Sequence, residues 1–490
     1  MIKAHIIGED GEGLFIDLST LFGENTEKSF INAYNLVIQR TGKTCKFTVS
    51  FDEREIEGPS GGLNTFVGFY SSITGKKIPN VLITGALDDK GDVLPVGGQY
   101  EKALEAKLEG FDGFVAVPGD IHEYCKLKSL DSDSFKIYFV DDIDDVLSIL
   151  FDEANYSFSI EDLNPVEIPK EKNPYNINDF TPYFDLIKEE YEKSKKVDEC
   201  HKEFYALFDK SVEKVLSKGY IYTGANFLFL ETSSLRANPH GILTRINKVS
   251  ACLNSIPKFN YSKEGFELQV GAVIRKYRAE YTINEVKRAF KESLTEEEKQ
   301  ELSKNVEQSY IWCLTAKSMI NNAEKGRLIN VSLYKGLAKN VLNEIERKEM
   351  DIVKKGGGPF IKLAVRAYID EDYVASYFLG LYALSYIKDN YVTSFKTFWG
   401  RVYASQAYYY KYSDPQTYDR LMTLATLLEK GFISPGYVVL EEGESWIVIS
   451  MVFIGFIIVI LISVKVGKGG ASNGKRGKGV FKTKKRKRKH

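Results

Sequence analysis

Residues 57–62 read Glu-Gly-Pro-Ser-Gly-Gly, and residues 93–102 read Val-Leu-Pro-Val-Gly-Gly-Gln-Tyr-Glu-Lys. The first stretch places Ser60 in a glycine-rich turn, and the second ends on Lys102, 42 residues later. A serine hydroxyl is a poor nucleophile until a base removes its proton, and a lysine can be that base when burial lowers its pKa toward neutrality. The two stretches therefore predict a catalytic pair in which Ser60 is the nucleophile and Lys102 is the base.

Apolar residues recur at helical spacing directly after Ser60 and predict a helix there. The N-terminal amides of such a helix would face the negative charge that develops on a substrate carbonyl. Glycines beside Ser60, Gly61 among them, let the backbone approach a substrate closely. Lys102 is expected one turn into a second amphipathic helix. The residues expected to be buried in these two helices are Leu63, Phe66, Val67, Phe69 and Tyr70, then Ala103, Leu104 and Leu108.

These motifs resemble the proteolytic domain of the Lon family. The nucleophile of that family lies in a Gly-Pro-Ser-Ala-Gly motif, which is similar to residues 58–62, and its lysine ends a Leu-Pro-Ile-Gly-Gly-Leu-Lys-Glu-Lys motif, which is similar to residues 94–102. Residues 73–75 resemble the end of a family helix, residues 83–85 the end of a strand, and residues 113–118 the strand after the lysine helix. Motifs in this order and spacing are far more specific than any one of them.

The resemblance covers residues 1–152 and implies a Lon-type α/β proteolytic domain. It implies catalytic roles for Ser60 and Lys102 and supporting roles for Thr84, which would orient Lys102, and Glu57, which would shape the substrate groove. Three positions depart from the family pattern: Ala86, Tyr100 and Glu57. They affect the substrate groove and the environment that adjusts Lys102 as a base. Taken singly, the Ser60 turn is an ordinary helix cap and Lys102 a solvated lysine, so only their joint arrangement favours catalysis.

A phosphate-binding loop is not found in the sequence. Residues 40–44 read Arg-Thr-Gly-Lys-Thr, but Val37 stands where such a loop needs a glycine, and residues 27–40 predict an amphipathic helix. We therefore expect proteolysis that does not depend on ATP.

The last part of the chain predicts a membrane anchor. Residues 446–464 are nineteen consecutive uncharged residues, and at about 1.5 Å per residue they nearly span a hydrocarbon core of about 30 Å. Twelve lysines and arginines and no acidic residue follow in 465–490. This charge bias predicts a single-pass protein of the cell membrane with its tail in the cytoplasm and its catalytic body outside.

The same layout resembles C-terminally anchored proteins of archaeal type. Residues 1–7 lack the apolar region of a signal peptide, so a tail anchor with a cytoplasmic body remains open. We expect the basic tail to be disordered and to contact anionic lipid, and we expect no nucleic-acid partner.

Cysteines and histidines give no metal or disulfide pattern. The five cysteines are widely spaced and odd in number, which argues against a disulfide framework, and no CxxC pair occurs. The five histidines form no HxxxH pair, so a metalloprotease has no support. The sequence predicts neither a metal nor a cofactor.

The composition of the segments predicts five parts. A Lon-like proteolytic domain at 1–152 is followed by a proline-containing linker at 153–180, and helical spacing then dominates a domain at 181–436. The transmembrane helix at 446–464 and the basic tail at 465–490 complete the chain. The sequence does not indicate what the helical domain binds.

These observations predict a membrane-anchored, ATP-independent serine endopeptidase that cuts unfolded or flexible polypeptides. The alternative is a non-catalytic membrane receptor or scaffold whose Lon-like domain binds peptide without turnover. Intact Ser60 and Lys102 count against the alternative, because a domain without catalysis has no chemical need for them. The expected partners are a polypeptide substrate and the membrane, and a homo-oligomer is left open.

Overall fold

The computed structural model describes residues 4–433 apart from short gaps at 10, 17–20, 23, 52–54, 57, 197 and 388–389. Within these residues the chain is mostly helical, and its strands form four small sheets of two or three strands each. The expected fold class, a Lon-type α/β proteolytic domain followed by a mostly helical domain and one C-terminal transmembrane helix, is therefore wrong. The strands are short compared with the helices: the longest strands have six residues, whereas the longest helix has 27 residues.

The predicted membrane location is also not supported. None of the helices among the described residues is both long and apolar enough to cross a bilayer. The expected span 446–464 and the basic tail 465–490 lie outside the described residues.

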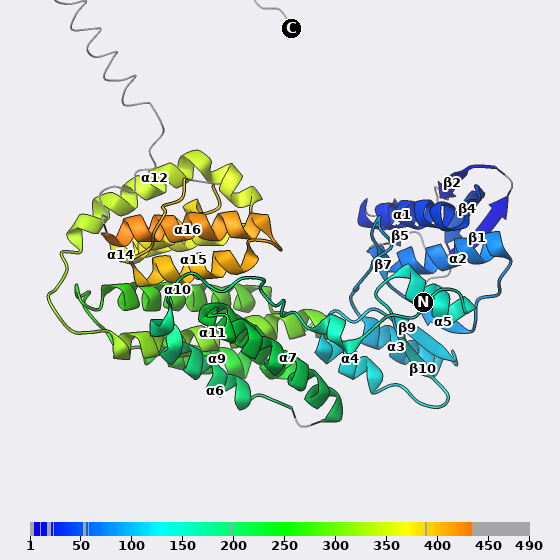
Figure 1. Ribbon diagram of the computed structural model, residues 1–490, viewed down its shortest axis with the longest axis horizontal. Helices are drawn as coiled ribbons and strands as arrows, with labels where there is room; N and C mark the ends of the chain where they lie inside the picture. The colour runs from blue at the N-terminus through cyan, green and yellow to red at the C-terminus, as the bar shows by residue number, and fades with distance from the viewer. Residues whose placement is uncertain are drawn as a thin grey trace, which may run out of the picture. The chain divides into compact units, whose positions relative to one another are not determined.

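The strands lie in the N-terminal third of the chain (Figure 1). In one sheet β4 pairs antiparallel with β1 and parallel with β2; in another, β9 pairs parallel with both β6 and β10. Two-stranded sheets join β3 to β5 and β7 to β8. The strands are β1 Ala4–Glu9, β2 Gly13–Ile16, β3 Leu21–Phe22, β4 Lys46–Phe51, β5 Glu55–Ile56, β6 Val81–Ile83, β7 Ala86–Leu87, β8 Val93–Leu94, β9 Gly113–Ala116 and β10 Lys136–Phe139.

Five helices pack with these sheets. They are α1 Glu24–Thr41, α2 Gly62–Thr74, α3 Gln99–Leu108, α4 Ile121–Lys128 and α5 Ile143–Phe151. Helix α2 follows Ser60 as predicted, runs beside α1, and ends where Gly75 adopts the left-handed conformation that glycine tolerates best (Figure 1). Phe47 of β4 stacks on Phe69 of α2 with ring centroids 4.1 Å apart, which places the apolar core between helix and sheet.

From α6 onward the described chain is helical, as its apolar spacing predicts. Its helices are α6 Thr181–Glu192, α7 Glu199–Ser217, α8 Ile221–Arg236, α9 Ile242–Asn254, α10 Phe266–Ala289, α11 Glu296–Asn322, α12 Ser332–Lys354, α13 Gly358–Ile369, α14 Tyr373–Leu384, α15 Phe398–Tyr410 and α16 Pro415–Ile433. Helix α10 packs on α11, and α15 on α16 (Figure 1).

Trp399 of α15 is a central packing residue of these helices. It is 2% exposed, its indole N–H donates to the carbonyl of Glu267 at 2.7 Å, and the Arg275 guanidinium lies 4.7 Å from its ring centre. Gly271 faces the ring so closely that a Cβ there would lie 2.2 Å from Trp399 Cζ2. Only glycine allows this approach between α10 and α15.

The segment expected as a linker, 153–180, contacts the helices directly. The Asn173 side-chain amide donates to Ser405 Oγ at 2.7 Å, and the Tyr409 hydroxyl donates to the carbonyl of Glu167 at 2.6 Å. The boundaries at 152 and 180 stay a prediction.

Two disulfides correct the expectation drawn from the cysteines. Cys125 of α4 is bonded to Cys200 of α7, and Cys252 of α9 is bonded to Cys313 of α11, while Cys45 is free. The partners are 75 and 61 residues apart, so spacing along the chain gave no indication of the pairs.

Candidate active site

Ser60 lies in a single 3-10 turn, Pro59–Gly61, directly before α2. The turn begins at Gly58, whose φ of 93° is a conformation that only glycine adopts without strain. The Thr26 hydroxyl donates to the carbonyl of Gly58 at 2.9 Å, and Ser29 Oγ donates to the carbonyl of Pro59 at 3.2 Å. Two side chains of α1 thus hold the turn in place, and Ser60 itself is half-buried.

Gly62, rather than Gly61, is the glycine that packing requires. Gly62 is buried, and a Cβ there would lie 1.9 Å from Ser29 Oγ and 3.3 Å from the amide nitrogen of Leu87. Gly61 has ordinary right-handed helical angles, and a Cβ there would meet Phe30 at 3.5 Å, an ordinary van der Waals distance. The expected close approach of the Gly61 backbone to a substrate stays a prediction.

Thr84 and Gly85 lie beside the Ser60 turn. The amide of Gly85 donates to the carbonyl of Ser60 at 3.1 Å, and Leu63 of α2 donates to the carbonyl of Gly85 at 3.1 Å. Thr84 is 4% exposed, and its hydroxyl donates to the same Ser60 carbonyl at 3.5 Å. The structure therefore brings Thr84 to the backbone of Ser60.

Lys102 lies in the first turn of α3, as predicted, and is half-buried. Its Nζ donates to the carbonyl of Gly97 at 2.8 Å, in the loop that precedes the helix. Glu57, the predicted groove residue, lies outside the described residues.

The buried face of α3 differs from the predicted one. Ala103 is buried as expected, but Leu104 and Leu108 are 39% and 80% exposed. Gln99 occupies the buried face, where its side-chain amide donates to the carbonyl of Val117 at 2.7 Å and its Oε1 accepts from the amide of Val117 at 2.8 Å. This two-point contact fixes the start of α3 to the end of β9, and hydrophobic spacing cannot reveal it.

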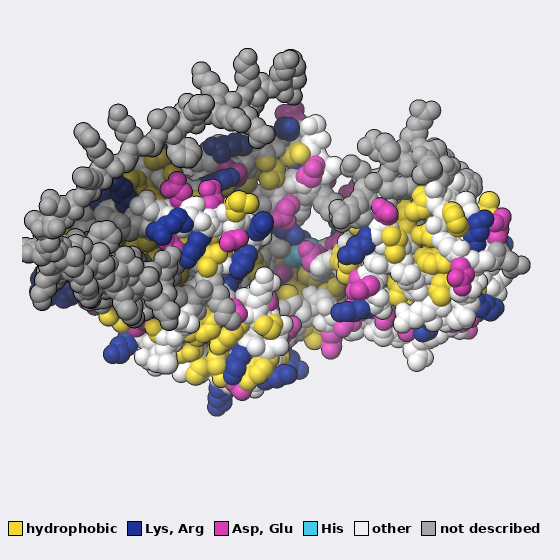
Figure 2. Space-filling model, turned by 90° about the horizontal axis from the view of Figure 1, so that it is seen from above, with side chains coloured by type: hydrophobic (Ala, Val, Ile, Leu, Met, Phe, Trp, Pro, Cys, Tyr) yellow, Lys and Arg dark blue, Asp and Glu magenta, His cyan; other side chains and the backbone are white. Residues whose placement is uncertain are grey.

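A cleft of about 1620 Å³ opens beside the start of α3. Its wall includes Gly98–Glu101 of the α3 turn, His122 of α4, His201 of α7 and Lys304 of α11. On the face drawn in Figure 2, basic and acidic side chains are interspersed rather than gathered by sign. The cleft is lined by both acidic and basic side chains, and neither Ser60 nor Lys102 is among its lining residues.

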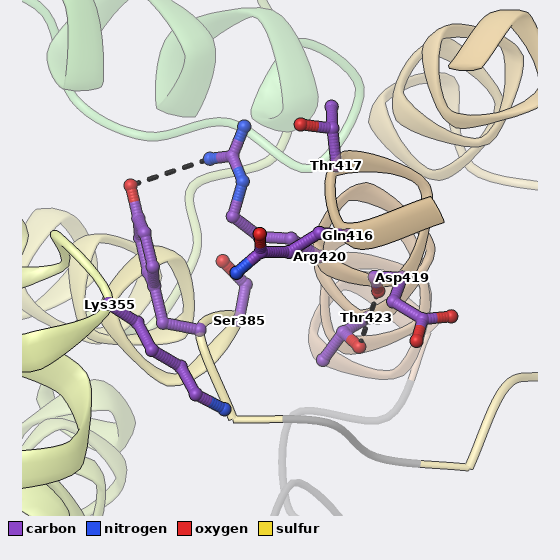
Figure 3. A pocket seen from close by; sticks show the side chains of 8 residues that line it. Lys355, Ser385, Gln416, Thr417, Asp419, Arg420 and Thr423 are labelled. Atoms are coloured by element: carbon purple, nitrogen blue, oxygen red, sulfur yellow. Dashed lines mark hydrogen bonds between the residues drawn. The ribbon is translucent and has the colours of Figure 1, made fainter. Parts of the chain in front are cut away.

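A second, smaller cavity of about 380 Å³ lies among the helices (Figure 3). Arg420 of α16 points across it and donates to the Tyr386 hydroxyl at 3.4 Å, and the Thr423 hydroxyl donates to the carbonyl of Asp419 at 2.8 Å. None of the residues predicted to act in catalysis lines this cavity.

Comparison with known proteins bears on the region that contains Ser60. Residues 54–153 match the family described as the Lon protease (S16) C-terminal proteolytic domain. A mitochondrial Lon protease homolog of Drosophila melanogaster is 27% identical over 114 residues, which is 23% of this chain and 11% of that protein. The Lon protease of Cytophaga hutchinsonii is 32% identical over 120 residues, 24% of this chain and 14% of that protein.

Lon protease 2 of Borreliella burgdorferi is 33% identical over 95 residues, which is 19% of this chain and 12% of that protein. The chain thus spans only about an eighth of the length of the curated relatives it matches. None of these three proteins is archaeal, so they give no support to the expected archaeal type, nor to membrane anchoring. What the comparisons support is a protease whose residues 54–153 are similar to the Lon proteolytic domain.

Proposed function

We propose that this chain is a serine endopeptidase that cleaves unfolded or flexible polypeptides with Ser60 and Lys102. The observation that carries the proposal is the Ser60 turn, which presents a serine at the start of a buried helix within the stretch that matches a protease domain. Backbone and side-chain hydrogen bonds from α1 and from Gly85 hold this turn, so the nucleophile is positioned before substrate arrives.

In the proposed reaction Ser60 Oγ attacks the scissile carbonyl, and Lys102 accepts the hydroxyl proton and later donates it to the leaving amine. The amide of Gly62 already donates to the carbonyl of Pro59, and that of Leu63 to Gly85. The amide of Gly61 is used within the 3-10 turn itself, so we assign the amide of Ser60 to the developing oxyanion. Thr84, through its hydroxyl contact with the Ser60 carbonyl, acts as a positioning residue.

The proposal includes cleavage that does not depend on ATP, because the sequence of this chain contains no phosphate-binding loop. The purified chain should cleave an unfolded protein at the same rate with and without ATP and magnesium. A severalfold stimulation by ATP would overturn this part of the proposal.

Labelling with a fluorophosphonate probe tests the nucleophile and separates a peptidase from a non-catalytic binding protein. The wild type should be labelled, and Ser60→Ala should not. Ser72→Ala is the matched control, because Ser72 lies exposed on α2, the helix that follows the Ser60 turn, and its loss should leave labelling unchanged. Absence of labelling in the wild type would favour a receptor or scaffold instead.

A further inference from the structure

Two arginines of α10 lie among buried aromatic side chains. Arg275 is 9% exposed, and its guanidinium lies 4.7 Å from the ring centre of Trp399. Arg278, one turn further along the helix, is half-buried. Its guanidinium lies 4.2 Å from the ring centre of Trp312 and 5.5 Å from that of Phe360. Residues three apart lie on the same face of a helix, so the two positive charges face the same part of the helical region.

Neither arginine has an acidic partner. Among the described residues, no carboxylate forms an ion pair with either guanidinium. The one hydrogen bond that Arg275 donates to a described residue goes to the carbonyl of Gly271 at 3.1 Å, within the same helix, and Arg278 donates none. A guanidinium carries five N–H donors. Most donors of both side chains therefore remain available to a further acceptor.

A continuous line of side-chain contacts joins the two arginines. The guanidinium of Arg278 lies on the ring of Phe360, and that ring stacks on Tyr382 with centroids 5.3 Å apart. The Tyr382 hydroxyl donates to the hydroxyl of Tyr403 at 2.8 Å. The Tyr403 ring in turn lies 6.1 Å from the tryptophan ring that Arg275 covers. The two charges and the two phenol groups therefore belong to one cluster, built from α10, α13, α14 and α15.

The charges of both arginines act on the phenol groups of this cluster. Burial raises the pKa of Tyr382 to about 12, and the two guanidinium charges act in the opposite direction. The same holds for Tyr222 of α8, whose pKa is raised by burial and lowered by both charges. A phenol hydroxyl can donate a hydrogen bond to an anion and brings no negative charge of its own. The surroundings of the arginines thus offer donors rather than a counter-charge.

This cluster is a costly place for two positive charges. Removing a charge from water is unfavourable unless an opposite charge and hydrogen bonds compensate it. The rings of Trp399 and Trp312 compensate in part, because an aromatic face attracts a cation. They supply neither a negative charge nor acceptors for the remaining N–H groups. Side chains that carry such a cost are typical of functional sites rather than of packing.

We propose that Arg275 and Arg278 bind an oxyanion, a carboxylate or phosphate group of a ligand that reaches the cluster from the solvent-accessible side of Arg278. A guanidinium binds either group through two parallel N–H donors, which lysine cannot do. The bound anion supplies the counter-charge that the described residues lack. The residues of this site all lie in the helices after residue 181, so the proposal does not rest on the proposed peptidase activity.

Thermal unfolding of the full chain, dialysed into chloride and then exposed to millimolar phosphate at constant ionic strength, tests the proposal. Phosphate should raise the Tm of the wild type, because a ligand that binds only the folded state stabilises it. Arg275→Met and Arg278→Met should each lose this rise. In chloride alone both variants should be about as stable as the wild type or more stable, because methionine is apolar and leaves no charge to bury.

Tryptophan fluorescence measures the affinity, because each arginine lies on a tryptophan ring. One titration uses inorganic phosphate, and a second uses N-acetyl-tetraalanine with a free C-terminus. Arg275→Gln and Arg278→Gln should each weaken the binding of the preferred anion by about 10–100-fold, the range that charge-assisted hydrogen bonds contribute. Tighter binding of the peptide identifies a carboxylate ligand, which the same peptide with an amidated end should not replace. Tighter binding of phosphate identifies a phosphorylated ligand.

Arg288→Gln is the matched control. Arg288 lies on the same helix, its side chain is 78% exposed, and it pairs with Glu285 at 2.6 Å, so its loss should leave anion affinity unchanged. Where a methionine or glutamine variant fails to fold, Arg278→Lys replaces it, because lysine keeps the charge but loses the two parallel donors. Ser60→Ala should bind anions as the wild type does, which separates this site from the proposed peptidase.

Two results would overturn the proposal. One is a wild type that responds to neither anion in Tm or fluorescence. A loss of stability of the methionine variants in chloride would then assign the two arginines to packing alone. The other is a response that survives substitution of both arginines, which would place the bound anion elsewhere on the chain.

Discussion

The stretch around Ser60 and the helices after residue 181 are held together by different means. Around Ser60 the chain is positioned by backbone hydrogen bonds and by glycines such as Gly58 and Gly62, whose conformation or close packing excludes other residues. Among the later helices, buried aromatic rings such as Trp399 set the packing. Backbone requirements leave a readable motif in the sequence, whereas side-chain packing leaves only a spacing that many sequences share.

The largest expected effect is the loss of peptide cleavage in variants that still fold. Ser60→Ala and Lys102→Ala should each lower peptide cleavage by about 10⁴-fold or more, and the double variant should be no worse, because residues that act as a unit are not additive. Cleavage of a fluorogenic unfolded substrate measures this. Lys102→Arg should also be inactive, since a guanidinium stays protonated near neutral pH.

The control for this experiment is stability. Ser60 and Lys102 are half-exposed, so their variants should unfold within about 0.5 kcal/mol of the wild type. An active Lys102→Arg protein would contradict the mechanism even if every variant folds.

The second effect tests packing in the helices. Trp399→Ala should lower the free energy of unfolding by about 3–5 kcal/mol, because it removes a buried ring and the hydrogen bond from its indole N–H to the Glu267 carbonyl. Denaturant titration with the disulfides intact measures the change. Leu243→Ala, at a side chain that is 57% exposed, is the control and should be nearly neutral. A small effect of Trp399→Ala would show that packing in this region is spread more evenly than the structure suggests.

The order of elements around Ser60 could be predicted, whereas the buried face of α3 could not. The apolar residues from Leu63 to Tyr70 all lie on the buried face of one helix, so their periodicity sufficed. In α3 the leucines indicated the wrong face: Gln99, Ala103 and Ala106 are the buried residues, Gln99 pairs with the backbone of Val117, and Leu104 is exposed. A polar residue that satisfies a buried backbone is invisible to hydrophobic patterns.

Gln99 is an exception in the Ser60 region, because here a side chain rather than the backbone makes the hydrogen bonds that hold two elements together. Gln99→Ala should lower stability by about 1–3 kcal/mol, since it leaves the buried amide and carbonyl of Val117 unpaired. It should also slow cleavage, because α3 carries Lys102. Gln99→Glu should fail to restore either property, since a carboxylate cannot donate to the Val117 carbonyl. Normal cleavage in both variants would contradict a positioning role.

The smallest expected effect concerns pH. Burial raises the pKa of Asp141 from 3.8 to about 7, with a further contribution from the hydrogen bond to Asp145. Between pH 3.8 and about 7 the folded state therefore keeps a proton on Asp141 that the unfolded state has lost. The stability that this bound proton provides is lost as pH rises from about 4 through about 7. Asp141→Asn should remove that loss and raise stability at pH 8 by about 1 kcal/mol or less, because the side chain is partly solvated.

Thermal unfolding of both proteins at several pH values measures the difference. At low pH the two should be equal, because Asp141 is protonated in the wild type. A variant that is less stable than the wild type at pH 8 would contradict the assigned direction.

The residues that sequence analysis missed share one property, which is distance along the chain. His122 and His201 are 79 residues apart, and Cys252 and Cys313 are 61 apart. Local motifs such as CxxC or HxxxH detect pairs within one element, whereas each of these two pairs joins two helices. Only the packing of α4 on α7 and of α9 on α11 brings them together.

The Cys125–Cys200 bond encloses the whole of the 153–180 segment. A single backbone cut anywhere between the two cysteines would therefore release nothing, because the piece that carries Ser60 would stay attached to the piece that carries the helices. Such a nicked molecule migrates as one band on a denaturing gel until a thiol reductant is added. A peptidase that clipped itself in this segment would be scored as intact by any assay that omits reduction.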